Sequence, residues 1–486
     1  MKNMKMMNAM RMKLFCLATF AMAMTAAHLT AQVFTTLHSF TGGSDGAHPY
    51  AGLILSGNTL YGAADQGTSY GYGTVFKVNT DGTGFKVLES FNGVNNEAYP
   101  ETSLLLSGST LYGASGGPGT TLGTLFAVNT NGTGFTTLHT FTTISAPDYT
   151  NSDGGAVWGP LILSGNTLYG AAWGGGSGGV GTVFALNTNG TGLTNLHSFT
   201  ATTPPFNPFV TPSPPYTNSD GACPTDGLIL SGNTLYGTTS FGGSSGWGTV
   251  FAVNTDGTGF TTLYTFTGGS DGGWPRRAPL ILSGNTLYGT TYEGGSGRGS
   301  SGKGTVFAVN TNGTGFTVLH SFTGSSDGAN PYGGLILSGN TLYGMANLGG
   351  SRGMGTVFAV NTDGTGFTNL YNFNGSRDGA NPYGGLILSG NTLYGTAYGG
   401  GSSGNGTVFS LSFPPQLTII PSETNLILTW PTNYAGFDYT GYTLEFTTNL
   451  VSPVWATNSP APVVVNGQNV VTNTISGTQQ FYRLSQ

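Results

Sequence analysis

Charged side chains are scarce in this sequence. Only 7% of the 486 residues are Asp, Glu, Lys or Arg, and the formal net charge is −6. A protein that binds nucleic acid must neutralise a run of phosphates, which takes many lysines and arginines. The 13 Lys and Arg residues, set against 19 Asp and Glu, are too few for such a surface. We therefore expect no nucleic-acid partner.

Cysteine is also almost missing. The chain has two, Cys16 and Cys223, and the first lies within residues 1–31, which have the features of a secretory signal peptide. Removal of that segment leaves one thiol, so no disulfide can form within the mature chain.

Apolar runs long enough to cross a membrane are lacking as well. The run at residues 14–27 follows a basic stretch, is too short for a spanning helix and suits the apolar region of a signal peptide. Cleavage is expected after Ala27 or Ala31. We predict bacterial export, a secreted or cell-surface location, and a mature chain without a transmembrane span.

Glycine, in contrast, is abundant, with 84 residues at the fixed positions of an internal repeat. The repeat is easiest to follow at a Ser-Gly turn, which is spaced by 51, 57, 67, 52, 55 and 51 residues. Its serines are Ser56, Ser107, Ser164, Ser231, Ser283, Ser338 and Ser389.

Each copy contains four short segments rich in β-branched and aromatic residues, separated by turns. In the copy at residues 333–373 they are residues 335–337, 341–344, 356–360 and 367–373. No helical periodicity is present, so strands are favoured. Four-stranded repeats of this length are typical of propeller blades. We therefore predict an all-β fold, with a seven-bladed β-propeller over residues 32–413.

The two ends of the repeat array complement each other. Residues 33–40 have the pattern of a fourth strand with no first three ahead of it, and the last copy stops after its third strand near residue 413. We predict that residues 33–40 close the last blade, which removes an exposed sheet edge.

Residues 414–486 no longer follow the repeat. Six short strand-like segments predict a small β-sandwich, and the spacing of Leu-Thr-Trp-Pro and Tyr-Thr-Leu is similar to that of fibronectin type III domains. Trp430 is expected to be a core residue.

Variation among the copies is confined to one side of the predicted propeller. The turns after the first and third strands are uniform, whereas the connections after the second and fourth strands differ, and two of the latter are long, at residues 142–160 and 200–227. We expect ligand contacts on this variable face. The candidates are Asp45, Asp153, Asp220, Asp271, Asp327, Asp378, Trp158, Trp173, Trp247, Trp274, Tyr149 and Tyr216.

Each kind of candidate has a structural alternative. The aspartates precede glycine, which is typical of a turn, and they are otherwise suited to a ligand or cation. The tryptophans either cover a neighbouring blade or form a rigid platform for a sugar or peptide.

Catalytic signals are weak. Glu97 and Glu101 are an acid/base candidate, and no motif of a serine hydrolase, zinc peptidase or nucleotide-binding loop is present. Histidines recur in the predicted fourth strand at residues 38, 139, 197 and 320, where other copies have Glu or Tyr, an exchange that a metal site does not tolerate. We expect no catalytic residue, metal or cofactor.

The repeated words LILSGNTLYG, GTVFAVNTDGTGF and LHSFTG resemble the GloVer tandem repeat of secreted bacterial "choice-of-anchor" proteins over residues 33–413. The strand layout is also similar to that of kelch-type propellers. The resemblance implies architecture and export, and no catalytic residues.

The sequence thus favours an exported, non-enzymatic binding or adhesion protein whose partner is an extracellular glycan or protein. The alternatives are a carbohydrate-active lyase or hydrolase, which would use the Asp-Gly residues or the Glu97/Glu101 pair, and a purely structural surface module.

Overall fold

The computed structural model describes residues 32–94, 98–116, 122–144, 148–205, 216–295, 302–475 and 479–486. The expected signal segment at residues 1–31, Glu97 and most of the proline-rich stretch in the connection 200–227 lie outside these residues. The described residues belong to two compact units, Val33–Ser412 and Phe413–Gln486. Both are built from β-strands, and no described helix is long and apolar enough to cross a membrane.

The described residues of Val33–Ser412 form seven antiparallel sheets, called sheets 1 to 7 in the order of their first strands. Sheet 1 contains β2 (Ile54–Ser56), β3 (Thr59–Ala64), β4 (Thr74–Asn79) and β5 (Lys86–Ser90). Sheet 2 contains β6 (Leu105–Ser107), β7 (Thr110–Ser115), β8 (Thr124–Asn129) and β9 (Thr136–Thr140). Sheet 3 contains β10 (Ile162–Ser164), β11 (Thr167–Ala172), β12 (Thr182–Asn187) and β13 (Thr194–Ser198).

The later sheets repeat this pattern. Sheet 4 contains β14 (Ile229–Ser231), β15 (Thr234–Thr239), β16 (Thr249–Asn254) and β17 (Thr261–Thr265). Sheet 5 contains β18 (Ile281–Ser283), β19 (Thr286–Thr291), β20 (Thr305–Asn310) and β21 (Thr317–Ser321). Sheet 6 contains β23 (Ile336–Ser338), β24 (Thr341–Leu348), β25 (Thr356–Asn361) and β26 (Thr368–Asn372), with β22 (Ala329–Pro331) also on β24. Sheet 7 contains β27 (Ile387–Ser389), β28 (Thr392–Ala397), β29 (Thr407–Ser412) and β1 (Val33–Ser39).

Sheet 7 takes its outer strand from the other end of the chain. β1 pairs antiparallel with β29, from Val33 opposite Ser412 to Ser39 opposite Thr407. The pairing shifts register between Thr36 and His38, as it does between the third and fourth strands of the other six sheets. β1 therefore has the geometry of a fourth strand.

A glycine in the second strand of every sheet makes room for a phenylalanine of the third. In sheet 3, a Cβ on Gly170 would lie 2.5 Å from the ring of Phe184. The third strands are almost wholly buried, whereas the fourth strands are only partly so. The repeated Gly and Phe are thus packing residues of the sheet interior.

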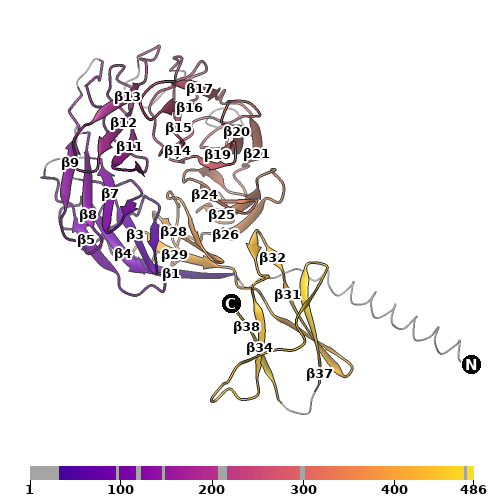
Figure 1. Cartoon of the computed structure of the whole chain (residues 1–486). Coiled ribbons are helices and arrows are strands. Elements are labelled where there is room, and N and C mark those ends of the chain that lie inside the picture. Colours follow the sequence, from indigo (N-terminus) through magenta and orange to yellow (C-terminus); the bar gives the residue numbers. More distant parts are fainter. Residues whose placement is uncertain are drawn as a thin grey trace, which may run out of the picture. The chain divides into compact units, whose positions relative to one another are not determined.

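The apolar clusters lie between neighbouring sheets, which makes the sheets depend on one another. One cluster joins Leu37 and Phe40 from the first segment and Val408 of sheet 7 to Leu60 and Phe76 of sheet 1. Figure 1 shows the sheets following one another in chain order round a common centre, with β28, β29 and β1 returning beside β3 and β4. The last sheet therefore packs on the first.

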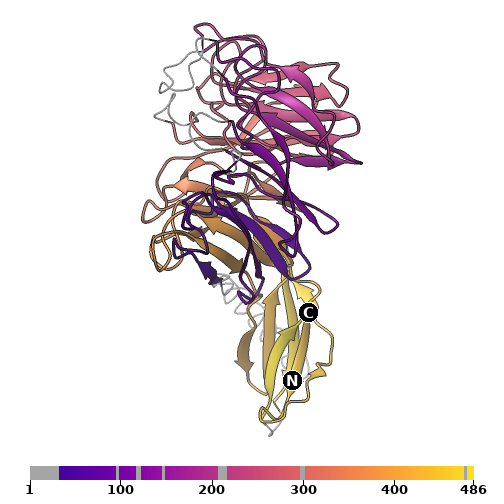
Figure 2. The ribbon, with the colours of Figure 1, turned by 90° about the vertical axis from the view of Figure 1, so that its left-hand side faces the viewer.

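The second unit contains two main sheets and a small hairpin. One sheet has the order β30 (Thr418–Ser422), β31 (Asn425–Pro431), β37 (Gln468–Thr474), β36 (Val463–Val465). The other has the order β35 (Ala456–Thr457), β34 (Thr443–Thr447), β38 (Phe481–Ser485), and β32 (Asn433–Tyr434) pairs with β33 (Phe437–Asp438). Figure 2 shows the longer of these strands lying side by side. Trp430 is fully buried with Leu428, Leu444 and Val471, so the prediction of a core tryptophan is confirmed.

The packing of the first segment gives a direct test. Phe40→Ala should lower the free energy of unfolding by about 3–5 kcal/mol, because it empties a fully buried site between sheets 7 and 1. Thr35→Ala, on the exposed side of β1, is the matched control and should change it by less than about 0.5 kcal/mol. Denaturant unfolding measures both, and equal effects would contradict the packing.

Candidate functional site

The six candidate aspartates bind their own turns. Asp45 accepts hydrogen bonds from the backbone amide of Thr41 at 2.9 Å and from His38 Nε2 at 3.2 Å. The other five repeat this arrangement. The amide donors are Thr142, Thr200, Thr267, Thr323 and Asn374, and the side-chain donors are His139, His197, Tyr264, His320 and Tyr371. The structure therefore leaves the six carboxylates in separate turns and does not bring them together.

Three of the fourth-strand histidines, His38, His197 and His320, also stack on a phenylalanine of the next sheet. The ring of His38 stacks on Phe85 of the next sheet, with centroids 3.6 Å apart and planes at 7°. Tyr264 makes the same stack on Phe316 and donates its hydroxyl to Asp271 at 3.1 Å. The exchange of His for Tyr among the copies follows, because either side chain makes both contacts.

The candidate aromatic residues form two groups. The ring centroids of Trp158 and Trp173 lie 4.8 Å apart with tilted planes, and those of Trp247 and Trp274 lie 5.9 Å apart. Trp274 also packs edge-on against Phe241. The remaining candidates, Tyr149 and Tyr216, are buried in their connections.

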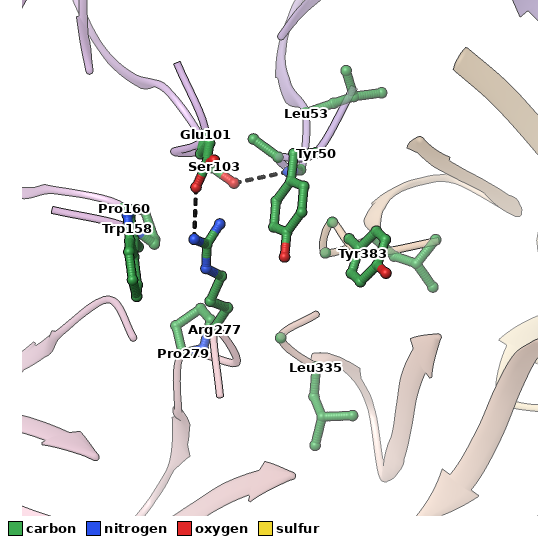
Figure 3. Close-up of a pocket in the computed structure, with 16 residues that line it drawn as sticks. Tyr50, Leu53, Glu101, Ser103, Trp158, Pro160, Arg277, Pro279, Leu335 and Tyr383 are labelled. Carbon is green, nitrogen blue, oxygen red and sulfur yellow. Dashed lines mark hydrogen bonds and ion pairs between the residues drawn. The ribbon is translucent and has the colours of Figure 1, made fainter. Parts of the chain in front are cut away.

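A pocket of about 170 Å³ lies where the connections before the first strands of six sheets converge. We call it the central pocket. Its lining includes Tyr50, Glu101, Trp158, Arg277 and Tyr383, and Figure 3 shows these side chains entering from several directions. Of the twelve candidates, only Trp158 lines it.

Five of the residues that line the central pocket occupy one column of the repeat, namely Tyr50, Glu101, Trp158, Arg277 and Tyr383. Each lies three positions before the leucine that precedes the first strand, such as Leu53 or Leu386. Read in chain order, the column is Tyr50, Glu101, Trp158, Thr225, Arg277, Tyr332 and Tyr383. At the next position of the repeat neighbouring connections come into close contact: a Cβ on Gly333 would lie 2.1 Å from the carbonyl oxygen of Gly384. Close packing thus leaves no room for a side chain at Gly333.

Arg277 is at the middle of this arrangement. Its Nη2 donates to Glu101 Oε2 at 2.6 Å, and its guanidinium carbon lies 4.5 Å from the ring centroids of both Tyr50 and Trp158. The side chain is only 10% exposed, and that of Glu101 is 23% exposed. Burial alone would lower the pKa of Arg277, but Glu101 together with Tyr332 and Tyr50 raises the pKa above its ordinary value. The arginine is therefore a permanent buried cation.

Further rings pack against the two that flank the guanidinium. Tyr50 stacks on Tyr383 with centroids 4.7 Å apart, and its hydroxyl donates to Tyr332 at 2.7 Å. Trp158 packs against Trp173 with the ring planes tilted by 33°. The order is thus Trp173, Trp158, Arg277, Tyr50 and Tyr383, so the ring faces next to the arginine are already covered.

A second carboxyl group, Asp65, belongs to the same electrostatic environment. It directly follows β3, is buried, and its Oδ1 has no hydrogen-bond partner. Burial and, next, the charge of Glu101 raise the pKa of Asp65 to about 8, although Arg277 opposes both. Asp65 is therefore largely protonated at neutral pH while Glu101 is held by an arginine. Among the described residues, no three His, Cys, Asp or Glu side chains are grouped to hold a metal ion.

Sequence reasoning missed Arg277, Asp65 and the tyrosines of this column. It compared the copies by face and by connection length, and so it found Trp158 and noted Glu101 without linking them. A position-by-position comparison, aligned on the leucine before each first strand, would have shown the column, because Tyr, Glu, Trp, Thr and Arg follow one another there.

The His–Asp pairs should make stability depend on pH. Burial lowers the pKa of His38 and His320 below 6.5, although their bonds to Asp45 and Asp327 oppose this. Below pH 6.5 the unfolded chain takes up protons that the folded chain does not, so stability is full above that pH and is lost as pH falls. The double variant His38→Tyr/His320→Tyr keeps both contacts, as Tyr264 does, and should lose less unfolding free energy between about pH 7.5 and 5.5. Unfolding titrations with the same pH slope in variant and wild type would refute this.

The ion pair at the centre gives a second test. Glu101→Gln leaves a buried cation without its anion and should lower the free energy of unfolding by about 3–5 kcal/mol. Adding Arg277→Met should restore much of the loss, because both charges are then gone. Glu445→Gln, in the more exposed pair with Arg483, is the control and should cost no more than about 1 kcal/mol. If Glu101→Gln proves as mild as the control in denaturant unfolding, the pair is not a buried one.

Comparison with known proteins identifies the family of this chain but does not indicate its activity. No curated protein matches the sequence of this chain. Among solved structures it is similar to an oligogalacturonate lyase from Vibrio parahaemolyticus, at a TM-score of 0.47 and 10% identity, over 79% of this chain and 98% of the other. It is also similar to a puromycin-hydrolyzing peptidase from Mycobacterium tuberculosis (TM-score 0.46, 10% identity, 83% and 62%) and to TolB from Acinetobacter baumannii (0.37, 12%, 61% and 59%). Scores at this level carry no argument about activity.

The match to a repeat family is extensive. The Gloeobacter/Verrucomicrobia repeat matches residues 23–210 and again residues 210–409, which together are most of the chain. These ranges include the described sheets 1 to 6 and most of sheet 7. The chain therefore belongs to the family of Gloeobacter/Verrucomicrobia repeat proteins.

Proposed function

We propose that this chain is an exported, non-enzymatic binding protein and that its ligand occupies the central pocket. The observation that carries the proposal is the set of side chains that line this pocket. The connections before five sheets place unlike side chains, namely aromatic rings, an arginine and a glutamate, round one cavity. Concave sites lined by aromatic groups and a few converging polar groups are typical of ligand binding.

The architecture that we propose for this function is a seven-bladed β-propeller at residues 32–413, with residues 33–40 closing the last blade. The pairing of β1 with β29 and the packing of sheet 7 on sheet 1 support it. Residues 414–486 would form a fibronectin type III-like sandwich. The strand order of the two sheets and the buried Trp430 support this proposal. Residues 1–31 would direct export to the medium or the cell surface.

The pocket has the size and chemistry for a small polar ligand or the end of a glycan. An engineered cavity of about 150 Å³ in another protein holds one benzene molecule, so this one is of suitable size for a single ring. Tyr383 and the hydroxyl of Ser103 line it beside Arg277. The candidate aspartates contribute less, because their oxygens are largely engaged by their own turns.

The binding proposal is tested on the mature chain. A glycan array identifies a ligand, and calorimetry then measures its affinity for wild type and variants. Trp158→Ala and Tyr383→Ala should each weaken binding at least about tenfold, because truncating an aromatic anchor in a pocket costs about 2 kcal/mol or more. Tyr70→Ala, at a side chain that is 65% exposed and outside the pocket, should leave affinity unchanged. If all three variants bind the ligand with the affinity of the wild type, the ligand lies outside the central pocket. If no glycan on the array binds, a purely structural module is favoured.

A carbohydrate-active enzyme is the second candidate, and Asp65 is the observation that favours it. A carboxyl group whose pKa burial raises to about 8 can act as a general acid, and Glu101 is a second carboxyl group in the same environment. Turnover of a polysaccharide that is lost in Asp65→Asn would support this function over simple binding.

A further inference from the structure

The connection before sheet 5, which contains Arg277, is one residue longer than its equivalents. Each connection has a left-handed residue, with a φ between 53° and 58°, shortly before the leucine that precedes the first strand. Five residues separate Trp274 from Leu280, whereas four do so in the other six connections. Arg277 also has a φ of 53°, in a region that residues other than glycine seldom adopt. The extra residue therefore needs contacts that hold its backbone in place.

These contacts come from the preceding connection, through Thr225 and Asp226. The amide of Ala278 donates to Asp226 Oδ1 at 2.9 Å, and the amide of Arg277 donates to Thr225 Oγ1 at 3.3 Å. Thr225 Oγ1 in turn donates to Asp226 Oδ1 at 3.0 Å, and Thr238 of β15 donates to Asp226 Oδ2. Thr225 and Asp226 are both buried, so water does not compete for these hydrogen bonds.

An aspartate is unusual at this position of the repeat, two residues before the leucine. The other connections have Ala51, Thr102, Gly159, Ala278, Gly333 and Gly384 there. Some neighbouring connections touch directly at this position: a Cβ on Gly159 would lie 2.3 Å from the backbone of Asp226. The longer connection before sheet 5 is instead reached by the side chain of Asp226. The carboxyl group thus occurs in the connection that directly precedes the one with the extra residue.

The role of Asp226 does not depend on its charge. Burial raises the pKa of Asp226, and the hydrogen bonds from Thr238, Ala278 and Thr225 oppose this. Ala278 and Thr225 both donate to Oδ1, which accepts hydrogen bonds whether or not Oδ2 carries a proton. Asp226→Asn therefore keeps the acceptor that matters, while Asp226→Ala removes it.

The backbone at Arg277 determines where its guanidinium lies. From there the side chain reaches Glu101, and its guanidinium carbon lies 4.5 Å from the ring centroids of Tyr50 and Trp158. A cation attracts an aromatic ring only within about 6 Å of the ring centroid, so a displaced backbone would lose these partners.

We propose that Asp226, together with Thr225, is the positioning residue of the central pocket. It holds the backbone of Arg277 and Ala278, so that the guanidinium meets Glu101 between Tyr50 and Trp158. The consequence for ligand binding rests on the proposed function, whereas the positioning itself can be tested without a ligand.

The test measures how far Glu101→Gln lowers the midpoint of denaturant unfolding of the mature chain in different backgrounds. With Asp226→Ala the arginine is no longer held against Glu101, so this shift should fall to about half of its wild-type size or less. With Asp226→Asn the shift should stay at its wild-type size. An undiminished shift with Asp226→Ala would overturn the proposal. Alanine occupies the same position at Ala51 and Ala278, which favours a folded variant.

Two further variants separate positioning from general stability. Asp220→Ala removes a buried carboxylate of the same connection that binds its own turn, so it should lower the midpoint but leave the Glu101→Gln shift unchanged. A reduction as large as that with Asp226→Ala would make the effect a general one. If Asp226→Ala does not fold, Thr225→Val replaces it, because it removes the hydroxyl that binds the amide of Arg277, and the same reduction is expected.

Ligand binding gives a separate result. For a ligand found on the glycan array, Asp226→Ala should weaken binding at least about tenfold, whereas Asp226→Asn should bind as the wild type does. Unchanged affinity in a folded Asp226→Ala variant would show that the ligand does not depend on this support. If the array finds no ligand, the proposed function fails, and the unfolding comparison still decides the positioning role.

Discussion

The pairing of β1 with β29 is the contact on which the rest of the repeat unit depends. Each four-stranded sheet has apolar faces that it cannot cover alone, so it needs a neighbour on both sides. Sheets 1 to 6 find their neighbours in chain order, but sheet 7 lacks a fourth strand until the first segment of the chain supplies it. That segment also brings Leu37 and Phe40 into the cluster shared with sheet 1. One strand thus completes a sheet and joins the last sheet to the first.

Closure determines where a site can lie. When the sheets surround a centre, the connections before their first strands converge, and residues far apart in sequence meet there. Glu101 and Arg277 are 176 positions apart and belong to the connections before sheets 2 and 5. Their ion pair spans the convergence point, and the stack of Trp158, Arg277 and Tyr50 fills part of it. The repeated strands form the sheets, while the variable column supplies the charged and aromatic side chains of the central pocket.

Local residue patterns were sufficient to predict the strands. The Ser-Gly turns, the Asp-Gly and Asn-Gly turns and the β-branched runs have clear local meanings, and a count of strands assigned residues 33–40 to the last copy. The His–Asp pairs were not found, because the interval from histidine to aspartate varies: it is 7 residues from His38 to Asp45, 14 from His139 to Asp153 and 23 from His197 to Asp220. The central pocket was missed for a related reason. Its residues share a position in the repeat, but they are not separated by a constant number of residues in the sequence. Local sequence patterns predict whether a segment forms a strand or a turn. Which segments come into contact is determined by the packing of the last sheet on the first.

The central claim is that the first strand lies on the last sheet, and a disulfide tests it most directly. Val33 lies opposite Ser412 in the pairing, so Val33→Cys/Ser412→Cys should oxidise readily to an intramolecular disulfide that peptide mass spectrometry identifies. Val33→Cys/Ser56→Cys places the partner on β2, the edge strand of the sequence-adjacent sheet, and should stay reduced. A disulfide in the second variant and none in the first would contradict the account.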